Sequence, residues 1–209
     1  GPSTIDEFSR GFKEDAELNP TNPYSKSKAD ADLLTLEYYK KYGLFVTISR
    51  SSNNFGPYQF PEKLIPLAID YLLADKKVPI YGNGKNLRNW IYVVDHCRAI
   101  EKIIKKGKPG EIFNIASTTT IANIDIIKLI IDILKKPADS IYFTKDRNVN
   151  DYSYILDYSK IKNELKWRES SSFIKNLKNT IKWYTKNVDW LFSIKSKESI
   201  EWETKHYSK

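Results

Sequence analysis

The sequence predicts an α/β fold built around a parallel sheet, because segments of helical length alternate with short apolar segments rich in β-branched residues. The clearest case is a predicted helix over 23–42 that leads at once into the predicted buried strand 44–48. A helix followed directly by an apolar strand is typical of a βαβ unit, whose strands run parallel. With 209 residues, 41% of them hydrophobic, the chain can form one sizeable core or two small ones.

The predicted helix 23–42 has clear start and stop signals. Two Asn-Pro pairs precede or begin it, and proline keeps the residue before it extended while it is itself tolerated in a first helical turn. Gly43 is typical of the residue that ends a helix. Tyr24 and Lys28 are four residues apart near its beginning, so they share one helix face. An ammonium group beside a phenol favours the phenolate, which makes Tyr24 a candidate base.

The Tyr-x-x-x-Lys spacing by itself is not specific, since it recurs at Tyr81/Lys85 and Tyr158/Lys162. The alternative interpretation is an ordinary solvated pair on a helix, and we favour it for the two later examples. Tyr24 differs in its setting. It stands at the head of a long helix, directly after a rigid extended segment, where a side chain can face a cleft.

The remaining segments continue the α/β pattern. A polar and aromatic loop over 50–61 follows strand 44–48, and we expect a site there rather than a simple connector, because ligands bind outside the carboxyl ends of strands in open α/β sheets. Asn123 is expected to cap the helix that follows it. The other predicted strands are 78–81, 90–94, 111–115 and 141–144, and the other predicted helices are 62–74, 95–106, 124–136, 158–165 and 172–186.

Composition excludes some classes of protein and leaves others open. The net charge of +8 comes from lysines scattered along the chain, which favours a solvated surface first, a phosphate-bearing substrate second, and no nucleic-acid partner. The sequence has no run of 18 apolar residues, so we expect no membrane span. A single cysteine, Cys97, excludes an intrachain disulfide and predicts a reducing, cytoplasmic setting. With two histidines and one cysteine, no metal site is expected.

Several motifs together resemble the nucleotide-sugar 4,6-dehydratases of the extended short-chain dehydrogenase/reductase superfamily, of the dTDP-glucose 4,6-dehydratase type. The resemblance runs from about Asn19 to Lys186, and its most specific part is the long run from Arg50 to Pro66. The motifs that carry it are Asn22-Pro-Tyr-Ser-Lys-Ser-Lys28, Arg50-Ser-Ser-Asn-Asn-Phe-Gly-Pro-Tyr-Gln-Phe-Pro-Glu-Lys-Leu-Ile-Pro66, Tyr81-Gly-Asn-Gly84, Arg88-Asn-Trp90 and Tyr92-Val-Val-Asp-His96.

The resemblance implies a fold and a division of the chain. The fold would be the C-terminal part of a Rossmann-like parallel sheet plus a small α/β substrate-binding domain. Residues 1–60 would be a remnant of the NAD-binding domain, 61–187 mainly the nucleotide-sugar-binding domain, and 188–209 a C-terminal tail. Family members begin with a Gly-rich turn that holds the NAD pyrophosphate, and this sequence has none. The turn Gly82–Arg88 does not fit Gly-x-Gly-x-x-Gly, because Leu87 occupies the sixth position. We therefore expect an N-terminally truncated enzyme that is inactive alone.

The resemblance also assigns roles to individual residues. Tyr24 would take the proton of the sugar 4-hydroxyl as hydride passes to NAD, and Lys28 would lower the pKa of Tyr24 and bind the nicotinamide ribose. The substrate would be dTDP-glucose or UDP-glucose, with Arg88 pairing with a phosphate. The other implied substrate-binding residues are Asn53, Lys63, Leu64, Tyr81, Asn123, Arg147 and Asn150. For Asn123, Tyr81 and Lys63 the alternatives are a helix cap, a packing contact and a solvated side chain.

Elimination of water across C5–C6 needs an acid and a base, which the family carries in Ser-Thr-Asp-Glu-Val. Here Asp6 and Glu7 match as acid and base, and Thr4 matches the threonine, but the additional Ile5 shifts the alternation between them. A disordered N-terminus without this role is the alternative. Near Arg147, Asn150 stands where family members often have histidine, so the base is left open and a uridine nucleotide remains an alternative to a thymidine nucleotide.

Three further possibilities remain open on the sequence. The chain could be a nucleotide-sugar-binding module without catalysis, or an epimerase of the same superfamily, although Asp6 and Glu7 favour the dehydratase. A nucleic-acid-binding protein is suggested by charge alone. We also expect a homo-oligomer, because strand 44–48 lacks the neighbouring strands that would cover it in a complete parallel sheet.

Overall fold

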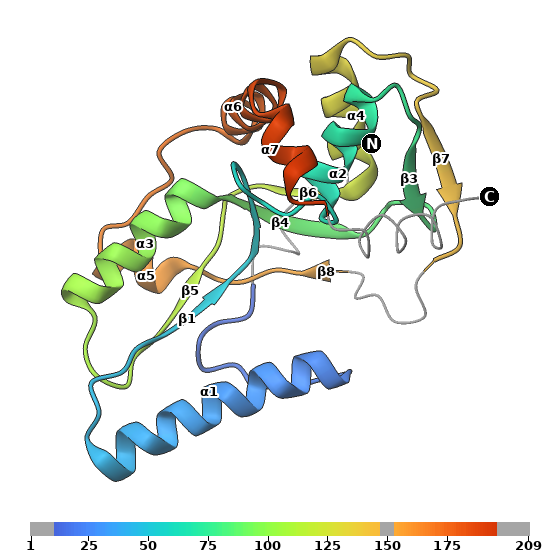
Figure 1. Cartoon of the computed structure of the whole chain (residues 1–209). Coiled ribbons are helices and arrows are strands. Elements are labelled where there is room, and N and C mark those ends of the chain that lie inside the picture. The colour runs from blue at the N-terminus through green and yellow to red at the C-terminus, as the bar shows by residue number, and fades with distance from the viewer. Residues whose placement is uncertain (1–10, 147–152, 196–209) are drawn as a thin grey trace, which may run out of the picture. The chain divides into compact units, whose positions relative to one another are not determined.

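A computed structural model describes residues 11–146 and 153–195 and confirms the α/β class with parallel strand pairs (Figure 1). The described chain forms two compact units, and each is built from three separate stretches. Unit 1 comprises 11–54, 89–120 and 154–170, and unit 2 comprises 55–88, 121–146 with 153, and 171–195. No helix in this part of the chain is long and apolar enough to cross a membrane.

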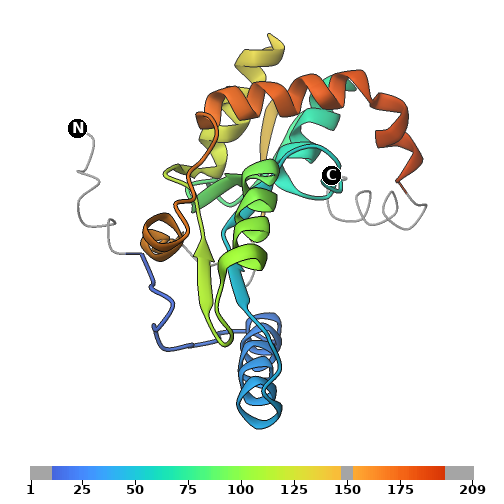
Figure 2. The ribbon, with the colours of Figure 1, turned by 90° about the vertical axis from the view of Figure 1, so that its left-hand side faces the viewer.

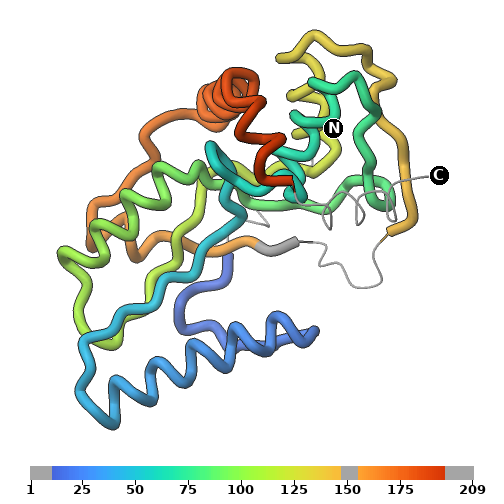
Figure 3. The backbone as a smooth tube through the Cα atoms, in the orientation of Figure 1, coloured from blue at the N-terminus to red at the C-terminus, as the bar shows by residue number. Residues whose placement is uncertain are grey.

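Unit 1 is organised around two parallel strands, β1 (Ile48–Ser51) and β5 (Ile112–Ile115), which run side by side in the tube of Figure 3. Ile48 lies opposite Ile112, and Ser51 lies opposite Ile115. Helices α3 (Val93–Lys106) and α5 (Ser159–Glu164) pack on β5. The core of this unit is formed by Ile91 together with side chains from α3, β5, α5 and the segment after α5: Ala99, Ile103, Phe113, Ile115, Ile161, Leu165 and Trp167.

Helix α1 (Pro23–Tyr42) also belongs to unit 1, but none of its 20 residues is buried. Its start follows the predicted signals. The Asn22 side chain accepts a hydrogen bond from the Ser25 backbone N–H at 2.9 Å. In return, the Asn22 backbone N–H donates to Ser25 Oγ at 3.1 Å. Gly43 closes the helix in the left-handed conformation, with φ 65°.

Unit 2 pairs β3 (Val78–Tyr81) with β7 (Ile141–Thr144) in parallel. Helix α2 (Leu64–Leu73) packs on β3, on α4 (Asn123–Leu134) and on α6 (Phe173–Lys186), which lies across both helices in Figure 2. A short helix, α7 (Val188–Ser193), packs on α6. Helix α2 is buried from Ile65 to Leu72, and its one charged residue there, Asp70, pairs with Lys195, so the helix lies at the centre of this core.

The chain passes between the units inside three strands, β2 (Asn53–Phe55), β4 (Leu87–Tyr92) and β6 (Thr120–Ala122). In the last described strand, β8 (Ser153–Tyr154), the chain passes back from unit 2 into unit 1. The units are therefore interleaved along the chain. The assignment of NAD-binding and substrate-binding roles to 1–60 and 61–187 stays a prediction.

Most predicted elements are confirmed within two residues, but the short strands β6 and β8 were not predicted, and four further details differ. Strand 44–48 is wrong, because pairing with β5 begins only at Ile48 and continues to Ser51, so that Leu44 and Phe45 are exposed. The expected loop 50–61 consequently contains the end of β1 and all of β2. Strand β4 starts at Leu87, three residues earlier than predicted, and α3 follows it directly at Val93. Helix α7 was missed because its six residues are too few to display a helical period.

Candidate functional site

Tyr24 and Lys28 lie in the first two turns of α1, and both side chains are exposed. Tyr24 has 75% of its surface accessible, so its hydroxyl is available to a ligand. The capping box at Asn22 and Ser25 holds the helix start in place around Tyr24. The structure thus confirms the predicted setting of the pair, at the head of a long helix after an extended segment.

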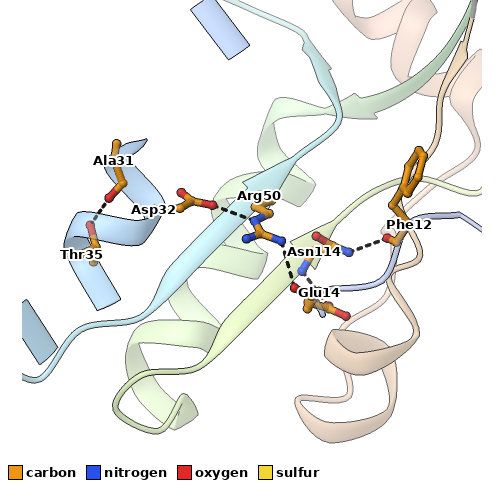
Figure 4. A network of polar contacts seen from close by, with 7 residues as sticks. All are labelled: Phe12, Glu14, Ala31, Asp32, Thr35, Arg50 and Asn114. Atoms are coloured by element: carbon orange, nitrogen blue, oxygen red, sulfur yellow. Dashed lines mark hydrogen bonds and ion pairs between the residues drawn. The ribbon is translucent and has the colours of Figure 1, made fainter. Parts of the chain in front are cut away.

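Helix α1 is tied to the rest of unit 1 by a polar network (Figure 4). Arg50 on β1 donates from Nε to Asp32 Oδ2 at 2.8 Å and from Nη1 to the carbonyl oxygen of Glu14 at 3.0 Å. The Glu14 side chain in turn accepts from the backbone N–H of Asn114 on β5 at 2.8 Å. Asp32 stands four residues after Lys28, so the network connects the helix that carries the Tyr–Lys pair to both strands of the sheet.

Sequence reasoning missed this network. In the sequence Arg50 is only part of a motif, and nothing in the spacing of residues 14, 32 and 50 indicates that they meet. The one signal in the sequence was the charged residue Arg50 beside an expected buried strand. A charge that is partly buried in a sheet needs a partner, so an ion pair could have been expected there.

Beyond β1, polar side chains follow the carboxyl end of the strand. Asn54 donates to Ser51 Oγ at 2.9 Å and to the Ser52 carbonyl oxygen at 3.2 Å, and Ser52 N–H donates to the carbonyl oxygen of Ile115. Asn53, the predicted substrate residue, is exposed at this edge. Because β1 and β5 are parallel, their carboxyl ends share one edge, where ligands bind in such sheets.

In unit 2, three predicted substrate residues surround one turn. Tyr81 and Arg88 stand on either side of the turn 82–87, and the start of α4 is bound to that turn. The Ile124 N–H donates to the Gly84 carbonyl oxygen at 3.0 Å, and the Asn123 N–H donates to the Asn86 carbonyl oxygen at 3.2 Å. These bonds place Asn123 beside the turn, so the structure brings Tyr81, Arg88 and Asn123 into one region.

Asn123 is not the helix cap that the sequence predicted. It is the first helical residue, and Ala122 takes the cap position without a side-chain hydrogen bond. The Asn123 side-chain oxygen is buried and has no hydrogen-bond partner within 11–146 and 153–195. A buried amide oxygen without a partner is unfavourable in a folded protein.

The structure does not bring the other predicted site residues together with those described above. Lys63 precedes α2 and is exposed, with its Nζ 2.7 Å from Glu62 Oε1, and Leu64 is half-buried at the first position of the helix. Thr4, Asp6, Glu7, Arg147 and Asn150 lie outside the described residues. Within the described ranges, no three His, Cys, Asp or Glu side chains are arranged to hold a metal ion.

Comparison with known proteins identifies the family. The family model described as GDP-mannose 4,6 dehydratase matches residues 6–180. A dTDP-glucose 4,6-dehydratase from Escherichia coli is 39% identical over 203 residues, which are 94% of this chain and 56% of the relative. The chain thus spans about half the length of the curated relatives it matches.

Solved structures agree with the sequence comparison. The dTDP-glucose 4,6-dehydratase from Bacillus anthracis, solved in complex with NAD, is 42% identical, with a TM-score of 0.86 over 90% of this chain and 60% of its own. The Streptomyces venezuelae dTDP-glucose 4,6-dehydratase, solved with NAD and a second ligand, is 40% identical, with a TM-score of 0.86 over 90% of this chain and 58% of its own. A family model that matches most of this chain shows that the chain belongs to the GDP-mannose 4,6 dehydratase family.

Proposed function

We propose that this chain carries the Tyr–Lys pair and the nucleotide-sugar-binding residues of an NAD-dependent dTDP-glucose 4,6-dehydratase. Such an enzyme oxidises C4 of the sugar, removes water across C5–C6 and returns hydride to C6. The observation that carries the proposal is the accessible position of Tyr24 and Lys28, one turn apart at the start of α1, in a chain of this family.

Each residue of the pair has a distinct task in the proposed reaction. Tyr24 takes the proton of the sugar 4-hydroxyl, which leaves the C4–H bond electrons free to depart as hydride. The Lys28 ammonium stabilises the phenolate and holds the nicotinamide ribose. NAD, when bound, supplies the hydride acceptor for C4 and the hydride donor for C6. Asp6 and Glu7 would protonate the departing 6-hydroxyl and remove the C5 proton, with Thr4 beside the 4-hydroxyl.

The residues present fit only the nicotinamide end of NAD. A pyrophosphate-binding turn opens a helix, whereas the glycine-containing turn 82–87 leads into strand β4. We therefore propose that the 209-residue chain does not turn over dTDP-glucose by itself. Formation of a 4-keto-6-deoxy sugar nucleotide by the purified chain would contradict this.

Nucleotide binding is proposed for unit 2, where Arg88 and the buried Asn123 side-chain oxygen lie at the turn 82–87 and the start of α4. A guanidinium group binds a diphosphate in a forked geometry, and an amide oxygen accepts from a base or ribose. A thermal-shift titration with dTDP, UDP and NAD tests this directly. We expect stabilisation by dTDP, a smaller shift with UDP, and none with NAD. The absence of any shift with dTDP would contradict the proposed site.

A pair of variants separates the phosphate contact from charge in general. Arg88→Ala is expected to weaken dTDP binding roughly 10-fold or more, since a charge-assisted hydrogen bond contributes about 1.5–3 kcal/mol. Lys85→Ala removes one positive charge from the same turn at an exposed position and serves as the matched control. Equal affinity losses in both variants would indicate a general charge effect and not an Arg88 contact.

A second copy of the chain is proposed to cover α1. Leu34, Tyr38 and Tyr42 follow one another at four-residue spacing, and they are 54%, 48% and 57% exposed. Such a stripe is typical of a helix that packs against another helix. Light scattering is expected to report a dimer, and Leu34→Glu combined with Tyr38→Glu is expected to give a monomer. A monomeric wild-type chain would exclude this arrangement.

A further inference from the structure

We propose that the ion pair between Arg50 and Asp32 is a positioning contact that sets the rotation of α1 about its axis and thereby directs Tyr24 and Lys28. The inference rests on the proposed function, in which these two side chains act on the substrate. Arg50 and Asp32 are positioning residues here, because they act through the helix and not on the sugar.

Within one copy of the chain, the apolar side chains of helix α1 are at most half-buried, as at Ala29, Leu36 and Tyr39, so a directed polar contact adds to what orients the helix. None of its 20 residues is buried, and its exposed residues include Leu33, Leu34, Tyr38 and Tyr42. A helix is normally oriented by an apolar stripe that faces a core. One apolar neighbour is close: the Tyr39 ring lies so near Gly110 that a Cβ there would collide with it. This contact lies near the C-terminal end of the helix, away from Tyr24 and Lys28.

The Arg50–Asp32 pair supplies an anchor with a defined direction. Its two side chains are only 15% and 21% exposed, whereas the Lys26–Asp30 pair on the same helix is 69% and 57% exposed. Water therefore screens the Arg50–Asp32 attraction less. The guanidinium plane is fixed by its second bond, to the Glu14 carbonyl oxygen, and Arg50 itself sits on β1 in register with β5. The direction of the Asp32 carboxylate is thus set by the sheet.

The spacing of residues on α1 relates the direction of Asp32 to those of Lys28 and Tyr24. Tyr24, Lys28 and Asp32 are at successive four-residue steps, and each step is about one turn, or roughly 6 Å along the axis. Each such step also moves the side chain about 40° around the axis, so Lys28 and Tyr24 keep a fixed angle to Asp32 of about 40° and 80°. Fixing Asp32 toward β1 therefore fixes the direction of Lys28 one turn away and of Tyr24 two turns away.

A distance measurement between spin labels tests the proposal in the 209-residue chain. The single cysteine, Cys97, is exposed on α3 and carries one label, and Lys28→Cys carries the other, so both labels belong to unit 1. Dilution into unlabelled chain removes signals between copies. We expect one narrow distance distribution with Arg50 and Asp32 intact, and loss of that narrow peak in Asp32→Asn and in Arg50→Gln.

Two controls make the result specific. Asp30→Asn removes the exposed ion pair one turn from Lys26 and is expected to keep the narrow peak, and Asp32→Glu is expected to restore most of it. An unchanged peak in both Asp32→Asn and Arg50→Gln would overturn the proposal. Titration of the same samples with dTDP separates the two ideas. If the peak is lost in these variants but the unsubstituted chain does not bind dTDP, the positioning contact stands and the proposed function fails.

Discussion

Asn89 and Ser117 form a reciprocal pair of hydrogen bonds inside unit 1. The Asn89 amide donates to the Ser117 carbonyl oxygen at 2.7 Å, and the Asn89 side-chain oxygen accepts from the Ser117 N–H at 2.8 Å. Both residues are almost completely buried, at 2% and 3% exposure. The side chain thus takes the place of a strand backbone and connects β4 to the segment that follows β5, one residue after the predicted phosphate contact at Arg88.

Asn89→Ala is expected to destabilise the protein by roughly 2–4 kcal/mol, because it leaves a buried N–H and a buried carbonyl oxygen without their partner. Urea unfolding measures the change in the free energy of unfolding. Asn163→Ala, at an exposed position of α5, is the control and is expected to have little effect. A similar stability for Asn89→Ala and the control would mean that water satisfies the two groups.

The turn beside Arg88 can be tested by a pair of glycine variants. Gly43 and Gly84 both have positive φ, 65° and 69°, so alanine at either position is strained by about 1–2 kcal/mol. A Cβ at Gly43 meets nothing within 4 Å, whereas a Cβ at Gly84 would lie 2.7 Å from Ile80 Cγ2 and 2.9 Å from Ile124 Cβ. Gly84→Ala is therefore expected to lose a further ~1–3 kcal/mol through overpacking.

The same pair of glycine variants also tests nucleotide binding. Gly84→Ala separates the turn from the start of α4, so dTDP affinity should fall in the titration, while Gly43→Ala should leave it unchanged. Equal unfolding free energies for the two variants would show that the turn moves to accommodate the methyl group.

His96 is expected to make stability depend on pH between about 5 and 7. Burial lowers the pKa of His96 below its ordinary value of 6.5, and its Nε2 is buried without a hydrogen-bond partner among the described residues. The unfolded chain therefore takes up this proton at a higher pH than the folded chain, and stability is lost as the pH falls from 7 to 5. His96→Gln should reduce that loss in pH-dependent urea unfolding. An identical pH dependence in both proteins would assign the effect to other groups.

Tyr184 is expected to stabilise the loop between β2 and α2. Its buried hydroxyl donates to the Gln59 carbonyl oxygen at 2.6 Å, and burial raises the pKa of Tyr184 well above its ordinary value of 10.0. Tyr184→Phe should destabilise the protein by about 1–2 kcal/mol. Since the unfolded chain ionises first as the pH rises above 10.0, wild type loses more stability at alkaline pH than the variant. Tyr58→Phe, at an exposed position, is the control.

Local signals explain the predictions that were confirmed. Helix α1 has the predicted bounds, 23–42, because Asn22, Pro23 and Gly43 act on backbone groups only a few residues away. Long-range pairing explains the errors. Strand β1 was expected over 44–48 from its apolar residues, but hydrogen bonds from β5, more than 60 residues later in the chain, select 48–51. Asparagine is typical of a helix cap, but in the structure the helix begins at Asn123 itself. The backbone N–H groups at this helix start donate to carbonyl oxygens of the 82–87 turn, which the sequence does not indicate.

The sequence by itself determined the α/β class, the family, and the presence of a Tyr–Lys pair at the head of a long helix, since these depend on neighbouring residues and on motifs that can be read along the chain. Only the tertiary structure decided which polar groups hold that helix and which part of the first strand pairs with β5. The physical reason is that hydrogen bonds and ion pairs such as Arg50 with Asp32 and Glu14 join residues 18 and 36 positions apart, and their partners are selected by folded geometry and not by spacing.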